Sequence, residues 1–138
     1  MYANSTPQPG STPDRYARHH TAVEYLTDHF HGAPVWIVAC IDHGDAKPNR
    51  HSGASIYPAV QNMLLAARTL GLRATLTTRH LFYEEDSEAA LGLPQGVHSH
   101  SILPIGYPMG NFGPVKRGEL ASITYLDRWH QPYPELSS

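Results

Sequence analysis

The stretch from Ser55 to Gly71 constrains this chain most strongly, because it predicts one long helix with an apolar stripe. Ser55 is the expected N-cap, Pro58 falls in the first turn, where a missing N–H costs little, and Gly71 ends the helix. The stripe consists of side chains that recur at helical spacing: Ile56, Val60, Met63, Leu64, Ala67 and Leu70. Such a helix must bury its stripe against another layer of the same domain.

The segments on either side of this helix predict strands and shorter helices. Val35 to Ile41 is an almost continuous apolar run, which indicates a strand buried on both faces. A helix is expected from Asp14 to Phe30, with Asp14 as its N-cap. The remaining elements expected are a polar loop over Asp42–Gly53, strands over Leu72–Thr78, His100–Ile105 and Ile123–Tyr125, and an acidic helix over Glu84–Leu91. Strands and helices therefore mix in an α+β or α/β layered domain, and the pattern leaves the direction of the sheet open.

Length, charge and cysteine content exclude several classes of protein. The 138 residues suffice for one hydrophobic core. We expect a flexible proline-rich arm over residues 1–14, the domain over residues 15–129 and a tail over residues 130–138. A formal charge of −2 gives no basic field that would attract nucleic acid or an anionic membrane. The single cysteine, Cys40, lies in an apolar run that suggests a buried structural thiol, and without a signal peptide or membrane span the expected location is cytoplasmic.

Ten histidines are the unusual feature of the composition. A small metal-binding protein is therefore one alternative to weigh. His98 and His100 would point to the same side of a strand, but no third ligand follows at a spacing typical of zinc sites. Histidines that are solvated or hydrogen-bonded are the simpler interpretation, and no metal site is expected.

Two local features could bind a cofactor. The first is the basic pair Lys116-Arg117 in a Gly/Pro loop, which could hold a phosphate, although such pairs are also common on solvated surfaces. The second is the end of the strand at Ala74–His80, where ligands often meet layered sheets; threonine is also simply a good strand former. No nucleophile elbow or dinucleotide-binding glycine motif is present, so any redox chemistry would come from a bound cofactor.

Three segments, in this order, resemble the C-terminal part of the nitroreductase family of FMN-dependent oxidoreductases. The first segment, Ser55–Leu72, resembles the central helix of the family, and the second, Thr75–Thr78, resembles the strand end beside the flavin. The third segment has three parts: Leu103–Pro108 resembles the closing strand, Phe112–Arg117 the phosphate loop, and Tyr125–Trp129 the tail. The resemblance covers roughly Pro34 to Trp129. No single segment is diagnostic, but their order and separation are fairly specific.

The resemblance implies an α+β fold, a nitroreductase-like three-layer α/β/α sandwich that here lacks the N-terminal helices. It implies a homodimer through the helix over residues 55–71, with FMN bound at the subunit interface. By position, Lys116 and Arg117 would hold the FMN phosphate, and Leu76, Thr77, Thr78 and Arg79 would lie along the isoalloxazine ring. These two groups are expected to face one groove. The implied activity passes electrons from NAD(P)H through FMN to a nitroaromatic, quinone or similar small acceptor.

This sequence departs from the family pattern at its beginning. The Arg-rich flavin-binding motif and the Asn/Gln stretch that follows it in the family are not visible, and Met1–Pro13 is proline-rich instead. This departure supports a second hypothesis, a non-catalytic or accessory nitroreductase-like subunit that a partner chain completes.

Overall fold

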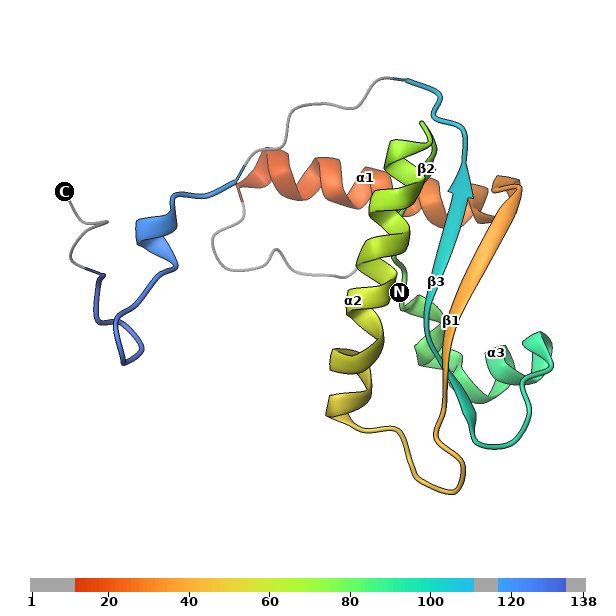
Figure 1. Cartoon of the computed structure of the whole chain (residues 1–138). Helices are drawn as coiled ribbons and strands as arrows, with labels where there is room; N and C mark the ends of the chain where they lie inside the picture. The colour runs from red at the N-terminus through yellow and green to blue at the C-terminus, as the bar shows by residue number, and fades with distance from the viewer. Residues whose placement is uncertain (1–11, 111–116, 134–138) are drawn as a thin grey trace. The chain divides into compact units, whose positions relative to one another are not determined.

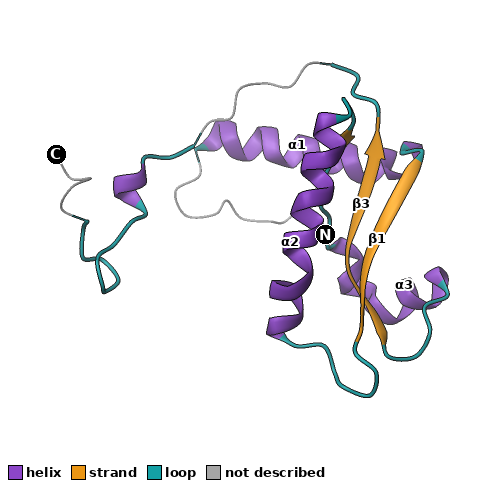
Figure 2. Cartoon of the chain, in the orientation of Figure 1, coloured by secondary structure: helices purple, strands orange, loops and turns teal. Residues whose placement is uncertain are grey.

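A computed structural model of the chain describes residues 12–110 and 117–133. The chain divides into two compact units, Met1–Pro108 and Met109–Ser138, each described here by itself. The first unit contains the helices and strands labelled in Figure 1 and coloured by type in Figure 2: α1 (Pro13–His29), β1 (Val35–Asp42), α2 (Arg50–Thr69), β2 (Arg73–Ala74), α3 (Glu84–Leu91) and β3 (Val97–Gly106). Short 3-10 helices are η1 (Phe30–Gly32) and η2 (Arg79–Tyr83) in the first unit and η3 (Leu120–Ser122) in the second.

The described sheet has three strands in the order β1-β3-β2. Both outer strands run antiparallel to β3, so β1 and β2 are parallel to each other without being neighbours. The unit β1–α2–β2 is therefore a crossover that leaves room for β3 between its two strands. This arrangement settles the strand direction that the sequence pattern left open.

Helix α2 begins earlier than the sequence predicted. Its N-cap is Asn49: the side chain of Asn49 accepts a hydrogen bond from the His51 N–H (2.8 Å), and the Ser52 hydroxyl accepts one from the Asn49 N–H (3.1 Å). These bonds satisfy amide groups that would otherwise lack partners, so the helix starts at Arg50 and the prediction of Ser55 as N-cap is wrong. Pro58 consequently lies inside the helix. It has no N–H to donate to the Ala54 carbonyl, and both Ala54 and Pro58 are exposed to solvent.

The C-terminal end of α2 agrees with the prediction. Gly71 has a φ of +75°, which a residue with a side chain rarely adopts. The Leu72 N–H donates to the Ala67 carbonyl (2.9 Å) and the Gly71 N–H to the Arg68 carbonyl (3.1 Å). This pair of bonds is the Schellman motif, which satisfies two carbonyls at the end of the helix.

The core lies between α2 and the sheet. Ala39 of β1, Val60 of α2 and Leu103 of β3 are buried together, and partly buried neighbours surround them: Ile37, Ile56, Met63, Leu64 and Ile105. The predicted stripe of α2 is thereby confirmed, except that Leu70 is 73% exposed. The expectation that β1 is buried on both faces is wrong at its beginning, where Val35 and Trp36 are exposed. The apolar run shows only which residues could be buried. Because β1 is an edge strand of the described sheet, it lacks a neighbouring strand on one side.

The predicted strand over Leu72–Thr78 is interrupted. It pairs with β3 only at Arg73 and Ala74 and again at the isolated bridge between Thr77 and Ile102. These pairs share one register, which places Thr75 opposite Pro104. Proline has no N–H to donate across this pair, so the ladder is broken at that point.

A β-bulge in β3 decides which side chains lie on which face of the sheet. Ala39 pairs with Ser101 and Cys40 with Ser99, so His100 is the additional residue. Ser101 therefore lies on the same face as Leu103 and α2, whereas Ser99 lies on the opposite face with Ile102. Because α3 contacts Ser99 and α1 faces Ile102, the helices form a layer on each side of the sheet. The three-layer α/β/α arrangement expected from the resemblance is confirmed.

The smaller elements follow the sequence prediction unevenly. Helix α3 has the predicted bounds, and α1 is confirmed, although its N-cap is Thr12, whose hydroxyl accepts from the Arg15 N–H (3.4 Å). Strand β3 is longer than predicted because its first residues continue the pairing with β1. The predicted strand over Ile123–Tyr125 is wrong: Ile123 follows η3, and Tyr125 forms only an isolated bridge with Pro132.

Candidate functional site

A cavity of about 250 Å³ lies between α1 and the opposing face of the sheet in the first unit. Helix α1 and the residue that follows it contribute an almost wholly apolar wall: Val23, Leu26, Thr27 and Phe30. The other wall contains the apolar Ile102 and the polar or charged side chains of Thr77, Arg79 and His80. A mostly apolar cavity with a few converging polar groups is typical of small-molecule sites.

The segment that resemblance associates with the flavin ring forms part of this cavity. The Thr77 N–H donates to the Ile102 carbonyl (3.0 Å), and the Ile102 N–H donates to that of Thr77 (2.9 Å), so the segment is fixed to β3. The Thr77 hydroxyl accepts from the Arg79 N–H (3.4 Å) and holds the turn into η2. The N–H of Thr78, between two residues that line the cavity, donates to no backbone carbonyl among the described residues.

The predicted site residues are only partly brought together. Thr77 and Arg79 line the cavity, but Leu76 and Thr78 do not. Leu76 lies opposite Leu103 in the common register, and its side chain is therefore on the face of α2. Lys116 lies outside the described residues, and Arg117 is exposed in the second unit. The expected common groove for the threonine edge and the basic pair therefore stays a prediction.

His80 lines the cavity and ends the strand segment that the sequence analysis selected, but it was not among the residues assigned to the flavin. Its Nε2 lies 3.1 Å from the Ser99 hydroxyl, and the Glu88 Oε1 accepts from the Ser99 N–H (2.8 Å) and lies 3.4 Å from the Ser99 hydroxyl. If the Ser99 hydroxyl donates to Glu88, the neutral His80 donates from Nε2 and keeps Nδ1 as an acceptor. The only signal in the sequence was that His80 directly follows Thr77–Arg79. Its partners come from α3 and β3 and could not be inferred from spacing.

Burial lowers the pKa of His80, and it outweighs the carboxylates of Glu88 and Glu84, which raise it; His100 lowers it further. Because the folded protein resists protonation of His80, the unfolded chain binds the proton first as the pH falls through about 6.5. The contribution of His80 to stability is therefore present above that pH and is lost as the pH falls toward the lowered pKa of the folded state.

We expect the melting temperature to fall between about pH 7.5 and pH 5.5, and to fall less in a His80→Gln variant. Thermal unfolding followed by circular dichroism, in buffers containing EDTA, measures this difference. An equal fall in the two proteins would show that His80 does not contribute. The other histidines are present in both proteins, so their contributions to the pH dependence of the melting temperature cancel in the comparison.

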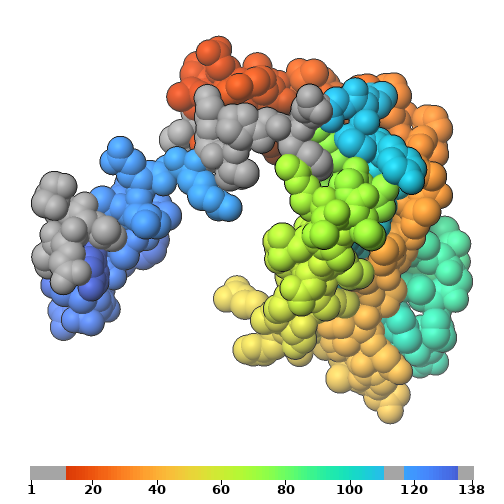
Figure 3. Space-filling model, turned by 45° about the horizontal axis from the view of Figure 1, so that its top comes forward, coloured from red at the N-terminus to blue at the C-terminus, as the bar shows by residue number. Residues whose placement is uncertain are grey.

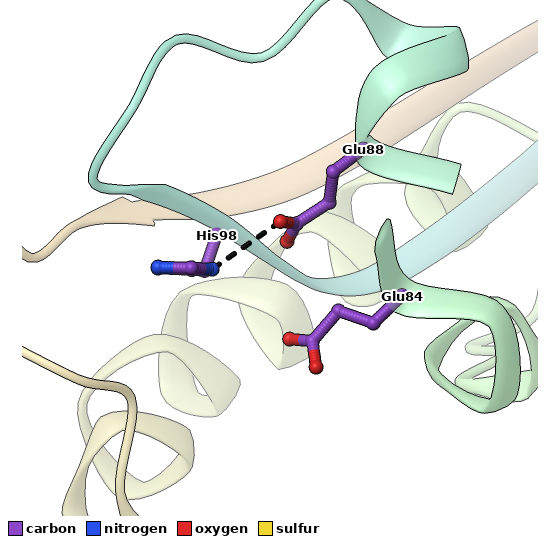
Figure 4. A group of neighbouring side chains, drawn as sticks. All are labelled: Glu84, Glu88 and His98. Carbon is purple, nitrogen blue, oxygen red and sulfur yellow. Dashed lines mark ion pairs between the residues drawn. The ribbon is translucent and has the colours of Figure 1, made fainter. Parts of the chain in front are cut away.

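A second polar group lies at the beginning of β3, where Glu84 and Glu88 of α3 approach His98. Glu84 and Glu88 of α3 and His98 of β3 each offer a ligand atom, and these atoms lie within 4.8 Å of one another (Figure 4). The Nε2 atoms of His43 and His100 are 3.4 Å apart beside this group. Burial, and secondarily Glu88, raises the pKa of the Cys40 thiol, which is half-buried rather than buried as the sequence predicted.

The chain belongs to the nitroreductase family. The model described as the nitroreductase family matches residues 2–107. This match begins before the resemblance noted in the sequence and ends before the loop that contains Lys116 and Arg117. Among the described helices, none has both the length and the apolar composition needed to cross a membrane.

Known proteins agree with this assignment. A Methanothermobacter thermautotrophicus protein, named as a candidate NADH dehydrogenase/NAD(P)H nitroreductase, is 32% identical over 99 residues, which are 70% of this chain and 51% of that protein. A nitroreductase-like family protein from Bacillus cereus is 22% identical, with a TM-score of 0.55, over 86% of this chain and 63% of that one. A variant of the FMN and NADPH-dependent nitroreductase NfnB from Sphigopyxis sp. strain HMH is 21% identical, with a TM-score of 0.59, over 87% and 54%. The chain thus spans about half the length of its curated relative.

Proposed function

We propose that this chain is an FMN-dependent oxidoreductase that passes electrons from NAD(P)H to a nitroaromatic, quinone or similar small acceptor. One observation carries the proposal: the Thr77–Arg79 segment, which by resemblance would lie along the flavin ring, forms a wall of a mostly apolar cavity. Family membership and the names of the similar proteins support the same activity.

The residues of the cavity fit the ring end of FMN. Ile102, Leu26 and Phe30 provide apolar surface against which a flat aromatic ring can pack, and the Thr78 N–H provides a nearby donor. The volume of about 250 Å³ is below the roughly 300–1,000 Å³ of pockets that enclose a whole ligand. The phosphate end would therefore extend beyond this cavity, and Lys116 with Arg117 is the proposed cationic partner.

In this proposal the bound FMN supplies the redox chemistry, and the protein supplies position and electrostatics. A backbone donor such as the Thr78 N–H favours negative charge on an acceptor atom beside it, and Arg79 adds positive charge on the same side of the cavity. Thr77 keeps this segment at a fixed distance from β3 through its backbone bonds with Ile102. The apolar wall of α1 excludes water from the ring.

Flavin titration tests the proposal. We expect the fluorescence of FMN to be quenched when it binds to the protein. The Arg79→Ala variant should bind FMN about tenfold or more weakly, since a hydrogen bond from a charged group contributes about 1.5–3 kcal/mol. Arg50→Ala, at an exposed position at the start of α2, is the matched control and should bind like the unmodified protein. The double variant Lys116→Ala/Arg117→Ala should lose phosphate-dependent affinity, and riboflavin, which lacks the phosphate, should bind both proteins equally. A protein that does not quench FMN fluorescence would refute the proposal.

The accessory-subunit hypothesis, in which a partner chain completes the site, is the second candidate. Part of α2 is at the surface in Figure 3, and the large apolar or aromatic side chains exposed on α2 and at its C-terminal end are Tyr57, Leu65 and Leu70. We propose that the exposed part of α2 forms the dimer interface. Light scattering with a steady-state assay separates the candidates: an isolated homodimer that reduces a nitroaromatic with NAD(P)H supports the enzyme, whereas activity only after addition of a longer flavoprotein supports the accessory subunit.

A further inference from the structure

We propose that Glu84, Glu88 and His98 form a binding site for a divalent transition metal ion, with Zn²⁺ as the preferred ion. The two carboxylates come from α3 and the imidazole from β3, and the three side chains converge in Figure 4. This site uses none of the residues assigned to the flavin, so it does not depend on the proposed function.

Glu88 is already held in the orientation that a metal ligand requires. One of its carboxylate oxygens, Oε1, accepts a hydrogen bond from the Ser99 N–H (2.8 Å). The other oxygen, Oε2, lies 3.3 Å from His98 Nδ1. In a tetrahedral site with bonds of about 2.0–2.1 Å, two ligand atoms are about 3.4 Å apart. Oε2 and Nδ1 therefore already have the separation of two ligands of one zinc ion, and Ser99 acts as the outer-shell group that orients a ligand.

The surroundings of His98 Nδ1 favour a cation. This atom is buried, and although it lies close to Glu88 Oε2 it makes no hydrogen bond of good geometry with any described group. A neutral imidazole that carries its proton on Nε2 presents the lone pair of Nδ1 to the carboxylate. Two lone pairs facing each other repel, and a positive ion between them removes the repulsion.

Glu84 completes the negative charge of the group. Glu84 and Glu88 are four positions apart on α3, where like charges destabilise a helix unless a cation offsets them. Glu84 is exposed, so its side chain can move the short distance needed to reach the ion. A nitrogen with two carboxylate oxygens suits Zn²⁺ or Co²⁺, whereas Mg²⁺ and Ca²⁺ prefer oxygen ligands alone. Water would occupy the remaining coordination positions.

Titration with Co²⁺, followed by displacement with Zn²⁺, tests the site in protein first treated with a chelator. We expect one visible absorption band to saturate at one equivalent of Co²⁺, to be abolished by Zn²⁺, and to be accompanied by a higher melting temperature with Zn²⁺. His98→Ala and Glu84→Gln should each weaken binding by at least the roughly 10–100-fold that loss of an outer-shell partner causes. Glu84 is exposed, so Glu84→Gln tests the site without disturbing the core.

Two control variants separate this site from nonspecific binding by other histidines. Glu85→Gln changes the neighbouring exposed carboxylate of α3. His20→Ala removes an ordinary i,i+4 pair, in which His20 Nδ1 lies 3.2 Å from the Glu24 carboxylate. Both controls should bind Co²⁺ and Zn²⁺ like the unmodified protein. Absence of stoichiometric binding, or equal affinity in Glu84→Gln and in its control, would overturn the proposal.

Discussion

Replacing Leu103 with alanine should lower the free energy of unfolding by about 2–5 kcal/mol. Leu103 has no exposed surface and lies in the middle strand, where it contacts the core formed with Ala39 and Val60. Removing its side chain loses the transfer free energy of the buried methyl groups and leaves a cavity between α2 and the sheet. Strands on both sides of β3 hold its backbone, so the chain cannot move to fill that cavity.

Urea denaturation measures the effect of the Leu103 substitution, with Leu70→Ala as the matched control. Leu70 is also a leucine of the predicted apolar stripe, but it is 73% exposed, and its truncation should change stability by at most about 0.5 kcal/mol. Similar losses in the two variants would contradict the placement of the core. Because Ile102 of the cavity wall is adjacent to Leu103, the Leu103 variant should also bind FMN less tightly under the proposed function.

Replacing Gly96 with alanine should be destabilising by about 3 kcal/mol, from a backbone conformation that costs about 1–2 kcal/mol and a steric overlap of similar size. Gly96 has a φ of +83°, and an added Cβ would overlap the carbonyl oxygen of Gly44. The neighbouring atoms belong to backbone and cannot rotate away as a side chain would. The Gly96 carbonyl also accepts a hydrogen bond from the His43 N–H (2.7 Å), which ties the loop after β1 to the beginning of β3.

Gly92→Ala is the control that isolates the two contributions at Gly96. Gly92 has a similar φ of +66°, but nothing lies within 4 Å of an added Cβ. Its substitution should therefore cost only the conformational part, about 1–2 kcal/mol. Comparison of the two variants by thermal unfolding gives the steric part by difference. Equal losses would show that the loop after β1 can move away from Gly96.

Local patterns in the sequence determined the helices of this protein well. The stripe of α2, its end at Gly71 and the bounds of α3 depend on side-chain spacing and on glycine at positive φ, which are properties of short segments. The start of α2 was missed because Asn49 and Ser52 cap it from within a stretch that looked like a polar loop. The family was also apparent from segments whose order and separation are preserved.

The candidate sites required the tertiary structure. Pro104 interrupts the pairing of a predicted strand because it lies opposite Thr75, and the bulge at His100 turns Ser99 toward α3. Both effects depend on the register between strands that are distant in the sequence. His80, Ser99 and Glu88, like Glu84 and His98, come together only through that register. The sequence alone thus determined the family, the main helices and two of the residues that line the cavity, Thr77 and Arg79, because these follow from local chemistry. Only the tertiary structure decided which polar side chains meet, because strand pairing places them.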